Sequence, residues 1–224
     1  KGIVLENNRV EALGKDEIVV EVIKEVQRAN YAGASRAEKG DQLRFTLSKD
    51  VADVENILGK VVDISFDRTG RAVRVENDKS YTYAEGPATA TEGKLNVNGT
   101  NYTVVTPERY KDNDERIFRT YHNDKAYSYE DFYKNPKTIN DRRRDDKFAV
   151  DYARVTIKNG KVLFIDAFTF DDIAPVKEVK RDGAEVYVYN DYRNGRVEKY
   201  EPARVISYTE KDGFNRSDKK DIDE

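Results

Sequence analysis

Three residue types are missing from this chain of 224 residues: cysteine, methionine and tryptophan. Without cysteine the protein cannot form a disulfide, use a thiolate nucleophile or bind zinc through sulfur ligands. With methionine missing as well, the chain holds no sulfur that is readily oxidised. That property suits a protein that works outside the cell, and we predict an extracellular location at a cell surface.

Long apolar runs and a strong net charge are also lacking. No run approaches the roughly 20 residues of a membrane-spanning helix, and no signal peptide is recognisable. Lysine and arginine number 40 against 43 aspartates and glutamates, which gives a formal charge of -3. We therefore expect neither nucleic acid nor an anionic membrane as a partner. Because the first residue is Lys1 and not methionine, we expect a processed product or a fragment.

Aromatic and charged residues are plentiful. Charged residues make up 37% and hydrophobic residues 38% of the chain, which includes 15 Tyr and 9 Phe. Aromatic side chains bury a large area each and favour pleated surfaces, so we expect a folded chain with a charged exterior. The length fits one large all-β domain or two ordinary domains.

Alternation of apolar and polar residues is the dominant pattern, and it predicts strands with one buried and one solvated face. The predicted strands cover residues 17–26, 42–47, 60–66, 71–77, 94–97, 101–105, 116–121, 152–157, 161–170, 184–190, 196–200 and 203–208. Hairpin turns are predicted around Gly70, Gly99, Gly160, Gly183 and Gly195, and the Asn-Gly turns favour type I′ geometry. The pattern predicts an all-β fold of antiparallel hairpins, forming small sandwiches or barrels with one or two short helices.

Other segments depart from this alternation. Short helices are predicted within residues 48–59 and 128–136, where Ser48 and Ser128 can cap the first turn. Residues 84–93 are small and polar and predict a loop, and residues 210–224 predict a frayed end or a linker.

These segments suggest a division of the chain. The predicted parts are an N-terminal β-rich domain (1–106), a connecting region with a short helix (107–147), a C-terminal β-rich domain (148–210) and a charged tail or linker (211–224). Residues 59–83, 152–170 and 184–200 share an order of strand, basic Gly turn and strand, at spacings too unequal for a solenoid. Duplicated small β-domains and unrelated hairpins with the same turn chemistry both explain this similarity.

Few residues suggest catalysis. His122 is the only histidine, so a Ser-His-Asp triad would require it, yet no nucleophile motif such as G-x-S-x-G accompanies it. We interpret His122 as a structural residue at a strand end beside a turn. The acid pairs Asp63 with Asp67, and Asp166 with Asp171 or Asp172, offer the two carboxylates of a glycosidase. In a chain this charged, we favour surface solvation as the role of these acids.

Two oxygen-rich clusters offer ligands for calcium. Asp112 and Asp114 lie in "KDNDER", and Asp171 and Asp172 lie in "FDDIA". Hard cations take such carboxylate ligands, although neither cluster has the spacing of an EF-hand loop. Calcium is thus the one cofactor that the sequence suggests.

A family resemblance follows from the hairpins. The segments "ARVTIKNGKVLFIDAF" and "GKLNVNGTNYTVV" resemble the β-modules of bacterial S-layer and other Gram-positive cell-surface proteins. The resemblance covers residues 59–105 and 148–208 and rests on the style of repeat and the lack of cysteine. No S-layer-homology anchoring motif is recognisable. The resemblance implies extracellular assembly with itself or with protein partners, which calcium can assist, and cell-wall polysaccharide is a candidate ligand.

Three hypotheses for function stay open. The favoured one is a non-catalytic structural or assembly module of an extracellular, S-layer-like surface protein. The second is a structural protein of a phage or virion, such as a tail or baseplate component, which has the same β-rich and cysteine-poor needs. The third is a carbohydrate-active enzyme that uses carboxylates. No catalytic residue is assigned.

Overall fold

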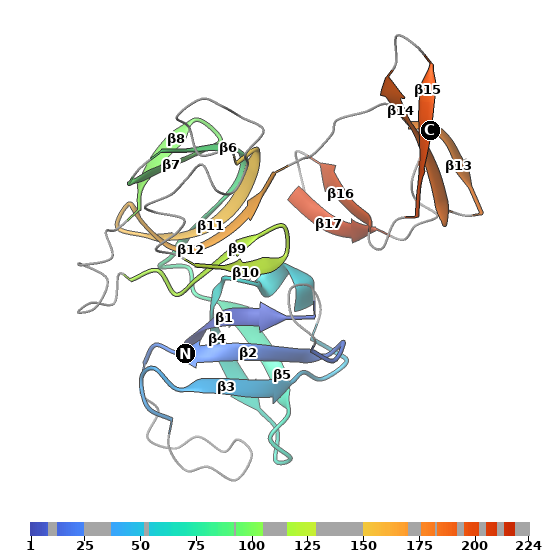
Figure 1. Ribbon diagram of the computed structural model, residues 1–224. Coiled ribbons are helices and arrows are strands. Elements are labelled where there is room, and N and C mark those ends of the chain that lie inside the picture. The colour runs from blue at the N-terminus through green and yellow to red at the C-terminus, as the bar shows by residue number, and fades with distance from the viewer. Residues whose placement is uncertain are drawn as a thin grey trace. The chain divides into compact units, whose positions relative to one another are not determined.

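The structure, a computed structural model, describes residues 1–8, 13–24, 37–51, 54–91, 93–104, 116–128, 150–169, 176–181, 183–191, 195–201, 205–209 and 213–217. For residues 54–55, 91, 190–191, 205–209 and 213–217 it describes the backbone only. Strands make up 63% of the structure and helix 1%, which confirms the predicted all-β fold. The chain forms two compact units, Lys1–Thr169 and Phe170–Glu224 (Figure 1).

The first unit begins with a five-stranded barrel, which we call the first barrel. Its strands are β1 (Gly2–Asn7), β2 (Glu17–Val22), β3 (Gln42–Thr46), β4 (Val61–Phe66) and β5 (Ala72–Asn77). They lie in the order β3-β2-β1-β4-β5, and a parallel bridge between Leu47 and Ala72 joins the two ends of this sheet. Apolar residues of every strand meet inside, among them Val4, Ile18, Val20, Phe45, Val62 and Ala72.

The rest of the first unit is a second barrel with one added hairpin. Its five barrel strands are β6 (Thr82–Thr91), β7 (Lys94–Val97), β8 (Thr100–Thr103), β11 (Tyr152–Lys158) and β12 (Lys161–Phe168). Parallel pairing of Thr103 with Lys161 closes this barrel, and the Thr103 amide donates to the Gly160 carbonyl at 3.0 Å. The hairpin of β9 (Arg119–His122) and β10 (Lys125–Tyr127) continues the sheet beyond β12.

The two barrels share one strand order. In each, three consecutive strands form an antiparallel meander, and the next two barrel strands form a hairpin. The first strand pairs with the fourth, and the end of the third lies parallel to the start of the fifth. This is the strand order of the OB-fold, a five-stranded Greek-key barrel. The shared order gives residues 59–83 and 152–170 the same place in the two barrels, so for these two segments it favours duplicated small β-domains. Residues 184–200 form β14 and β15, which occupy a different position in the order.

The second unit contains a meander and a hairpin. The strands β13 (Val176–Lys180), β14 (Glu185–Asp191) and β15 (Arg196–Tyr200) form a three-stranded antiparallel sheet. The strands β16 (Val205–Thr209) and β17 (Gly213–Ser217) form a two-stranded sheet. Residues 210–224 were predicted as a frayed end or linker, and β17 corrects that prediction for residues 213–217, because pairing with β16 satisfies their backbone.

Residues 84–93 also differ from their prediction, since most of them belong to β6. This strand lies between β11 and β7, and it pairs with β11 up to Pro87 and with β7 from Ala88. Its partner changes next to Gly86, whose φ is +152°. Side-chain size explains the small residues that follow, because Ala88 and Ala90 point into the closed core of the barrel.

The two predicted helices have different outcomes. The first is reduced to a single 3-10 turn, η1 (Val54–Ile57). The Lys60 amide bonds to the Ile57 carbonyl, and the Gly59 amide bonds to the Val4 carbonyl of β1 at 2.8 Å. These bonds carry the chain directly from η1 into β4 and so end the helical turn at Ile57. Most of the second predicted helix, residues 129–136, lies outside the described residues.

The hairpin turns confirm the turn chemistry. Asn98 and Gly99 have φ of +50° and +82°, and Asn159 and Gly160 have +52° and +74°, as a type I′ turn requires. The structure adds a turn of the same kind at Asn123 and Asp124, between β9 and β10, which lacks glycine. Asn194 of the remaining Asn-Gly turn lies outside the described residues.

Candidate functional site

The acids that the sequence suggested for calcium or catalysis do not form a site in the described structure. Asp112, Asp114, Asp171 and Asp172 all lie outside the described residues. In the part of the chain that is described, no three His, Cys, Asp or Glu side chains are grouped so that they could hold a metal ion. The calcium hypothesis therefore stays a prediction.

Asp63 and Asp67 have separate roles. Asp63 is 56% exposed and forms an ion pair with Lys1 at 3.2 Å. Asp67 accepts hydrogen bonds from the amide and hydroxyl of Thr69 at 2.8 and 2.7 Å, and from the Arg71 amide at 3.0 Å. The Thr69 hydroxyl and these amides lower the pKa of Asp67, because they stabilise the charged carboxylate. Asp67 thus holds the β4–β5 turn.

The remaining candidates lie near the end of the first unit. Asp166 is 2% exposed, and on β12 it stands in register between Arg154 of β11 and Tyr121 of β9. His122 occupies the predicted strand end beside a turn, and its Nε2 lies 2.9 Å from the Thr169 hydroxyl. The next residue, Asn123, accepts from the Thr169 amide and donates to the Thr169 carbonyl, at 3.0 and 3.2 Å. These contacts fix the chain where it leaves the first unit.

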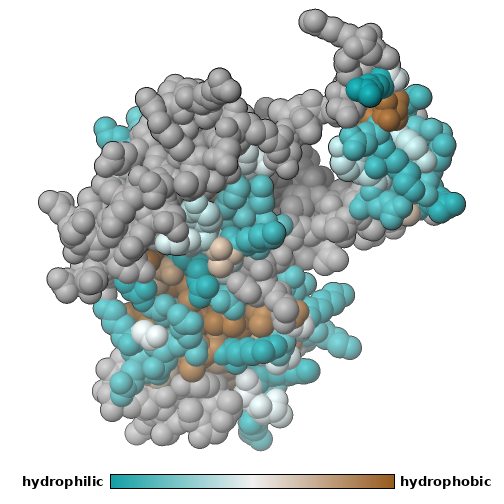
Figure 2. All heavy atoms as spheres, viewed as in Figure 1, coloured by the Kyte–Doolittle hydropathy of each residue, from teal (hydrophilic) through white to brown (hydrophobic). Residues whose placement is uncertain are grey.

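The two barrels contact each other, and we call this contact the junction. An apolar cluster lies at its centre: Ile3, Leu5, Val61, Tyr121 and Phe164, with Ile23, Leu58, Tyr81 and Phe118 packed around it. All five central residues are 1% exposed or less. Figure 2 shows apolar side chains gathered over β1 and β2, beside the β9–β10 hairpin. An interior this dry resembles a protein core, and it holds the two barrels together.

Buried hydrogen bonds cross the junction. The Tyr121 hydroxyl donates to the Leu5 carbonyl at 2.8 Å, at the bulge where β1 shifts its register against β2. The Thr156 hydroxyl donates to the Gly59 carbonyl at 2.6 Å. Gly59 itself has φ of +75°, and a Cβ atom there would lie 2.4 Å from the Phe164 ring. Glycine at this position therefore satisfies both the turn and the close approach of Phe164.

Charged side chains surround the apolar centre. Arg116 forms an ion pair with Glu21 of β2, whose side chain is only 4% exposed, and Arg119 pairs with Glu6 at 3.1 Å. Burial lowers the pKa of Arg116, but a guanidinium still remains charged. Removing Arg116 would leave the buried Glu21 carboxylate uncompensated, so this pair favours one alignment of the barrels.

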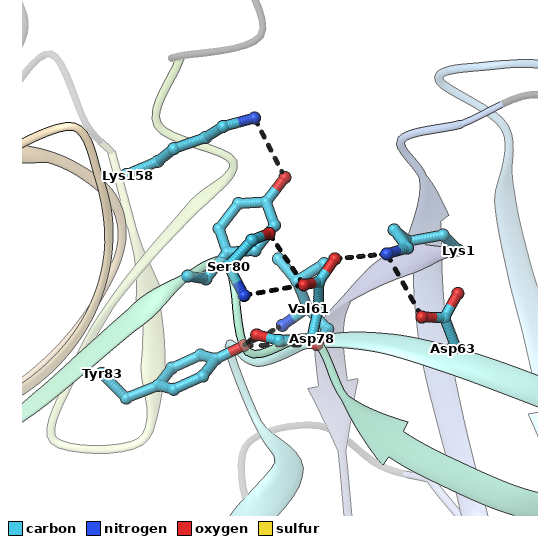
Figure 3. A network of polar contacts seen from close by, with 8 residues as sticks. Lys1, Val61, Asp63, Asp78, Ser80, Tyr83 and Lys158 are labelled. Atoms are coloured by element: carbon cyan, nitrogen blue, oxygen red, sulfur yellow. Dashed lines mark hydrogen bonds and ion pairs between the residues drawn. The ribbon is translucent and has the colours of Figure 1, made fainter.

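A polar network fixes the connection between β5 and β6, residues 78–81 (Figure 3). Asp78 forms an ion pair with Lys1 and accepts from the Ser80 amide and hydroxyl at 2.8 and 2.7 Å. Lys1, followed by the Ser80 groups, lowers the pKa of Asp78 to about 2. The network ties the connection to the start of the first barrel.

The same network reaches the second barrel through tyrosines. The Tyr83 hydroxyl accepts from the Val61 amide and lies within bonding distance of the Val61 carbonyl, both at 3.2 Å. Burial raises the pKa of Tyr83 to about 12, so its hydroxyl stays protonated and able to donate. Lys158 of β11 lies over the Tyr81 ring, 5.0 Å from its centre.

The arrangement joins two barrels. No helix in the described part has the length and apolarity needed to cross a membrane. Comparison with protein-family models, with curated proteins and with solved structures finds no match. The sequence did not predict the junction, because its residues come from strands of two barrels and the hairpin β9–β10.

Proposed function

We propose that this chain is a non-catalytic structural module of an extracellular bacterial surface protein, similar to the modules of S-layers. The observation that carries the proposal is the junction, in which a dry apolar cluster, buried hydrogen bonds and ion pairs fix one barrel against the other. A protein that maintains spacing and transmits force needs such fixed contacts between modules. Many functions use five-stranded Greek-key barrels, so the strand order alone does not carry this proposal.

Three of the described acids have structural roles, which supports a non-catalytic role. Asp67 and Asp78 accept bonds from their own turns, and Asp63 is an exposed partner of Lys1. A glycosidase instead needs two carboxylates that face each other across a bound sugar. The virion hypothesis shares the need for fixed modules, and it is distinguished by assembly with other virion proteins.

The test uses the purified chain in two assays. Sedimentation velocity across a concentration series, with and without millimolar calcium, is expected to show self-association that calcium strengthens. Incubation with isolated Gram-positive cell walls is expected to release no reducing ends. The variant D171N/D172N should lose the calcium effect, whereas the control D63N should keep it. Release of reducing ends, or a monomer at every concentration with and without calcium, overturns the proposal.

A further inference from the structure

The second unit contains the strands of one more barrel. The meander β13-β14-β15 has the order and antiparallel pairing of β1-β2-β3 and β6-β7-β8. It differs in that β13 has no further strand beside it in this sheet, whereas β1 pairs with β4 and β6 with β11. The β16–β17 hairpin follows it, as β4–β5 and β11–β12 follow the earlier meanders. In the first unit these two parts always close on each other.

Sequence details recur at matching places. The turn between the second and third strands is Asn98-Gly99 in the second barrel and Asn194-Gly195 in the second unit. The turn between the last two strands contains glycine in both barrels, at Gly70 and Gly160, whereas in the second unit Gly213 is the first residue of β17. The tripeptide Ala-Arg-Val also recurs, at residues 153–155 in β11 and at residues 203–205 where β16 begins. The similarity thus extends from strand order to turn chemistry.

One face of the β13–β15 sheet is mostly apolar. Val179, Val186 and Tyr200 stand in register across the three strands, beside Val176 and Val188, and Glu198 lies on the same face opposite Val188. In the first barrel the matching row is Val4, Val20 and Leu43, where Val4 and Val20 are at most 2% exposed. Tyr200 is 46% exposed, and Val186, at 6%, is the only buried member of the row. The row therefore has the composition of a barrel core but is more exposed to solvent than the matching row of the first barrel.

The other face of this sheet carries ion pairs around Tyr187, Tyr189 and Val197. Glu185 pairs with Arg181 and Lys199 at 3.1 and 3.3 Å, and Lys180 pairs with Glu178 at 3.2 Å. Such ion pairs suit a surface that faces water, so this is the more polar of the two faces.

We propose that the β16–β17 hairpin of the same chain packs on the apolar face and closes a third barrel. In this barrel β16 lies antiparallel to β13, and β17 lies parallel to β15. The proposal concerns the fold and internal docking surface of the second unit, and it stands whether or not the surface role is correct.

Chain length decides between the chain's own hairpin and that of a second copy. Four residues, 201–204, separate Tyr200 from Val205, and extended chain of that length spans about 17 Å. In the proposed order β17 lies between β15 and β16, so the chain that leaves β15 must pass one strand to begin β16. Two strand spacings amount to about 10 Å. The chain's own hairpin therefore reaches the face, and its high effective concentration favours it over a hairpin from solution.

Introduced cysteine pairs test the closure, since the natural chain contains none. The pair T103C/K161C is the positive control because these residues close the second barrel. The matching pair in the second unit is E201C/G213C, at the end of β15 and the start of β17. The negative control K180C/G213C places one cysteine on β13, which the proposed order separates from β17 by β16.

Each double variant of the full chain is oxidised mildly and analysed by non-reducing electrophoresis and peptide mass spectrometry. We expect the yield of intramolecular disulfide for E201C/G213C to lie within twofold of the yield for T103C/K161C. It should be at least tenfold higher than the yield for K180C/G213C. A yield equal to that of K180C/G213C overturns the proposal. Cross-linking mainly between two chains also overturns it, and assigns the face to a second copy.

Hydrogen exchange of the unmodified chain provides a second measurement that no substitution can disturb. In a closed barrel both edges of the β13–β15 sheet are paired. The exchange rates of amides in β13 and β15 should therefore lie within tenfold of the rates in β14. Rapid exchange of every second amide along β13 and β15 would show open edges and contradict the closure.

Discussion

Single carboxylates in this chain hold local turns. Asp67 accepts from the Thr69 amide and Asp78 from the Ser80 amide, each at 2.8 Å, and each carboxylate also accepts from the hydroxyl of that residue. The shared pattern is Asp-x-Thr or Asp-x-Ser, in which the side chain bonds the backbone two residues on. This pattern is visible in the sequence, so the role of both acids could have been predicted, whereas the approach of Lys1 to Asp78 could not.

Asp78 gives a prediction about pH. Its folded pKa of about 2 lies below the ordinary value of 3.8, so its contribution to stability is present above pH 3.8 and is lost as the pH falls toward 2. D78N should therefore lose less of its unfolding free energy than the natural chain between pH 5 and pH 2, by about 1 kcal/mol after solvent screening. Urea unfolding across this range measures the difference.

D63N is the matched control for this change. Asp63 also contacts Lys1, but it is 56% exposed, against 11% for Asp78. D63N should therefore lose about as much unfolding free energy between pH 5 and pH 2 as the natural chain does. Equal slopes for D78N and the natural chain would contradict the prediction.

At the scale of elements, alternating strands and Asn-Gly turns were predictable because their signals are local. β6 was not, since its sequence "TYAEGPATAT" is small and polar and contains Gly86 and Pro87. What makes it a strand is tertiary, because it bends between two partners and its alanines fit a narrow core. Likewise β1 is buried along nearly its whole length, so it lacks the alternation that identified other strands.

The approach of β12 to the turn after η1 gives a prediction about packing. G59A should destabilise the protein by about 1–3 kcal/mol more than G99A, because only the methyl group introduced at residue 59 would collide with Phe164. Both glycines have positive φ, +75° and +82°, and G99A would meet no atom within 4 Å. The backbone strain is thus common to both variants. Chemical unfolding of both measures the difference, and equal losses would show that Phe164 moves aside without cost.

At the scale of the whole molecule, the two barrels share one apolar cluster and should gain stability from each other. The pairing of β6 with β11 joins segments that the sequence assigned to separate β-rich domains. No local pattern indicates which distant strand will be a partner, and the residues of the junction look like ordinary strand residues in the sequence. Pairing and docking are therefore the parts of the fold that the sequence did not reveal.

Coupling between the barrels gives the third prediction. F164A, on β12 of the second barrel, should accelerate amide exchange in β1 and β4 of the first barrel by roughly a hundredfold, since removing a buried Phe costs about 3 kcal/mol. Hydrogen exchange with mass spectrometry measures both barrels in one experiment. V186A, in the second unit, is the control and should leave both barrels unchanged. Faster exchange in the second barrel alone would show that the barrels open independently.

The β9–β10 hairpin has a consequence for how such chains vary. Arg116, Phe118, Arg119 and Tyr121, which contact the first barrel, all come from the segment inserted between β8 and β11, which the barrel itself does not need. Part of the contact between the barrels is therefore encoded outside the barrels, while Phe164 of β12 and Thr156 of β11 supply the rest from within the second barrel. Shortening or exchanging this insertion would weaken the contact while each barrel keeps its own fold.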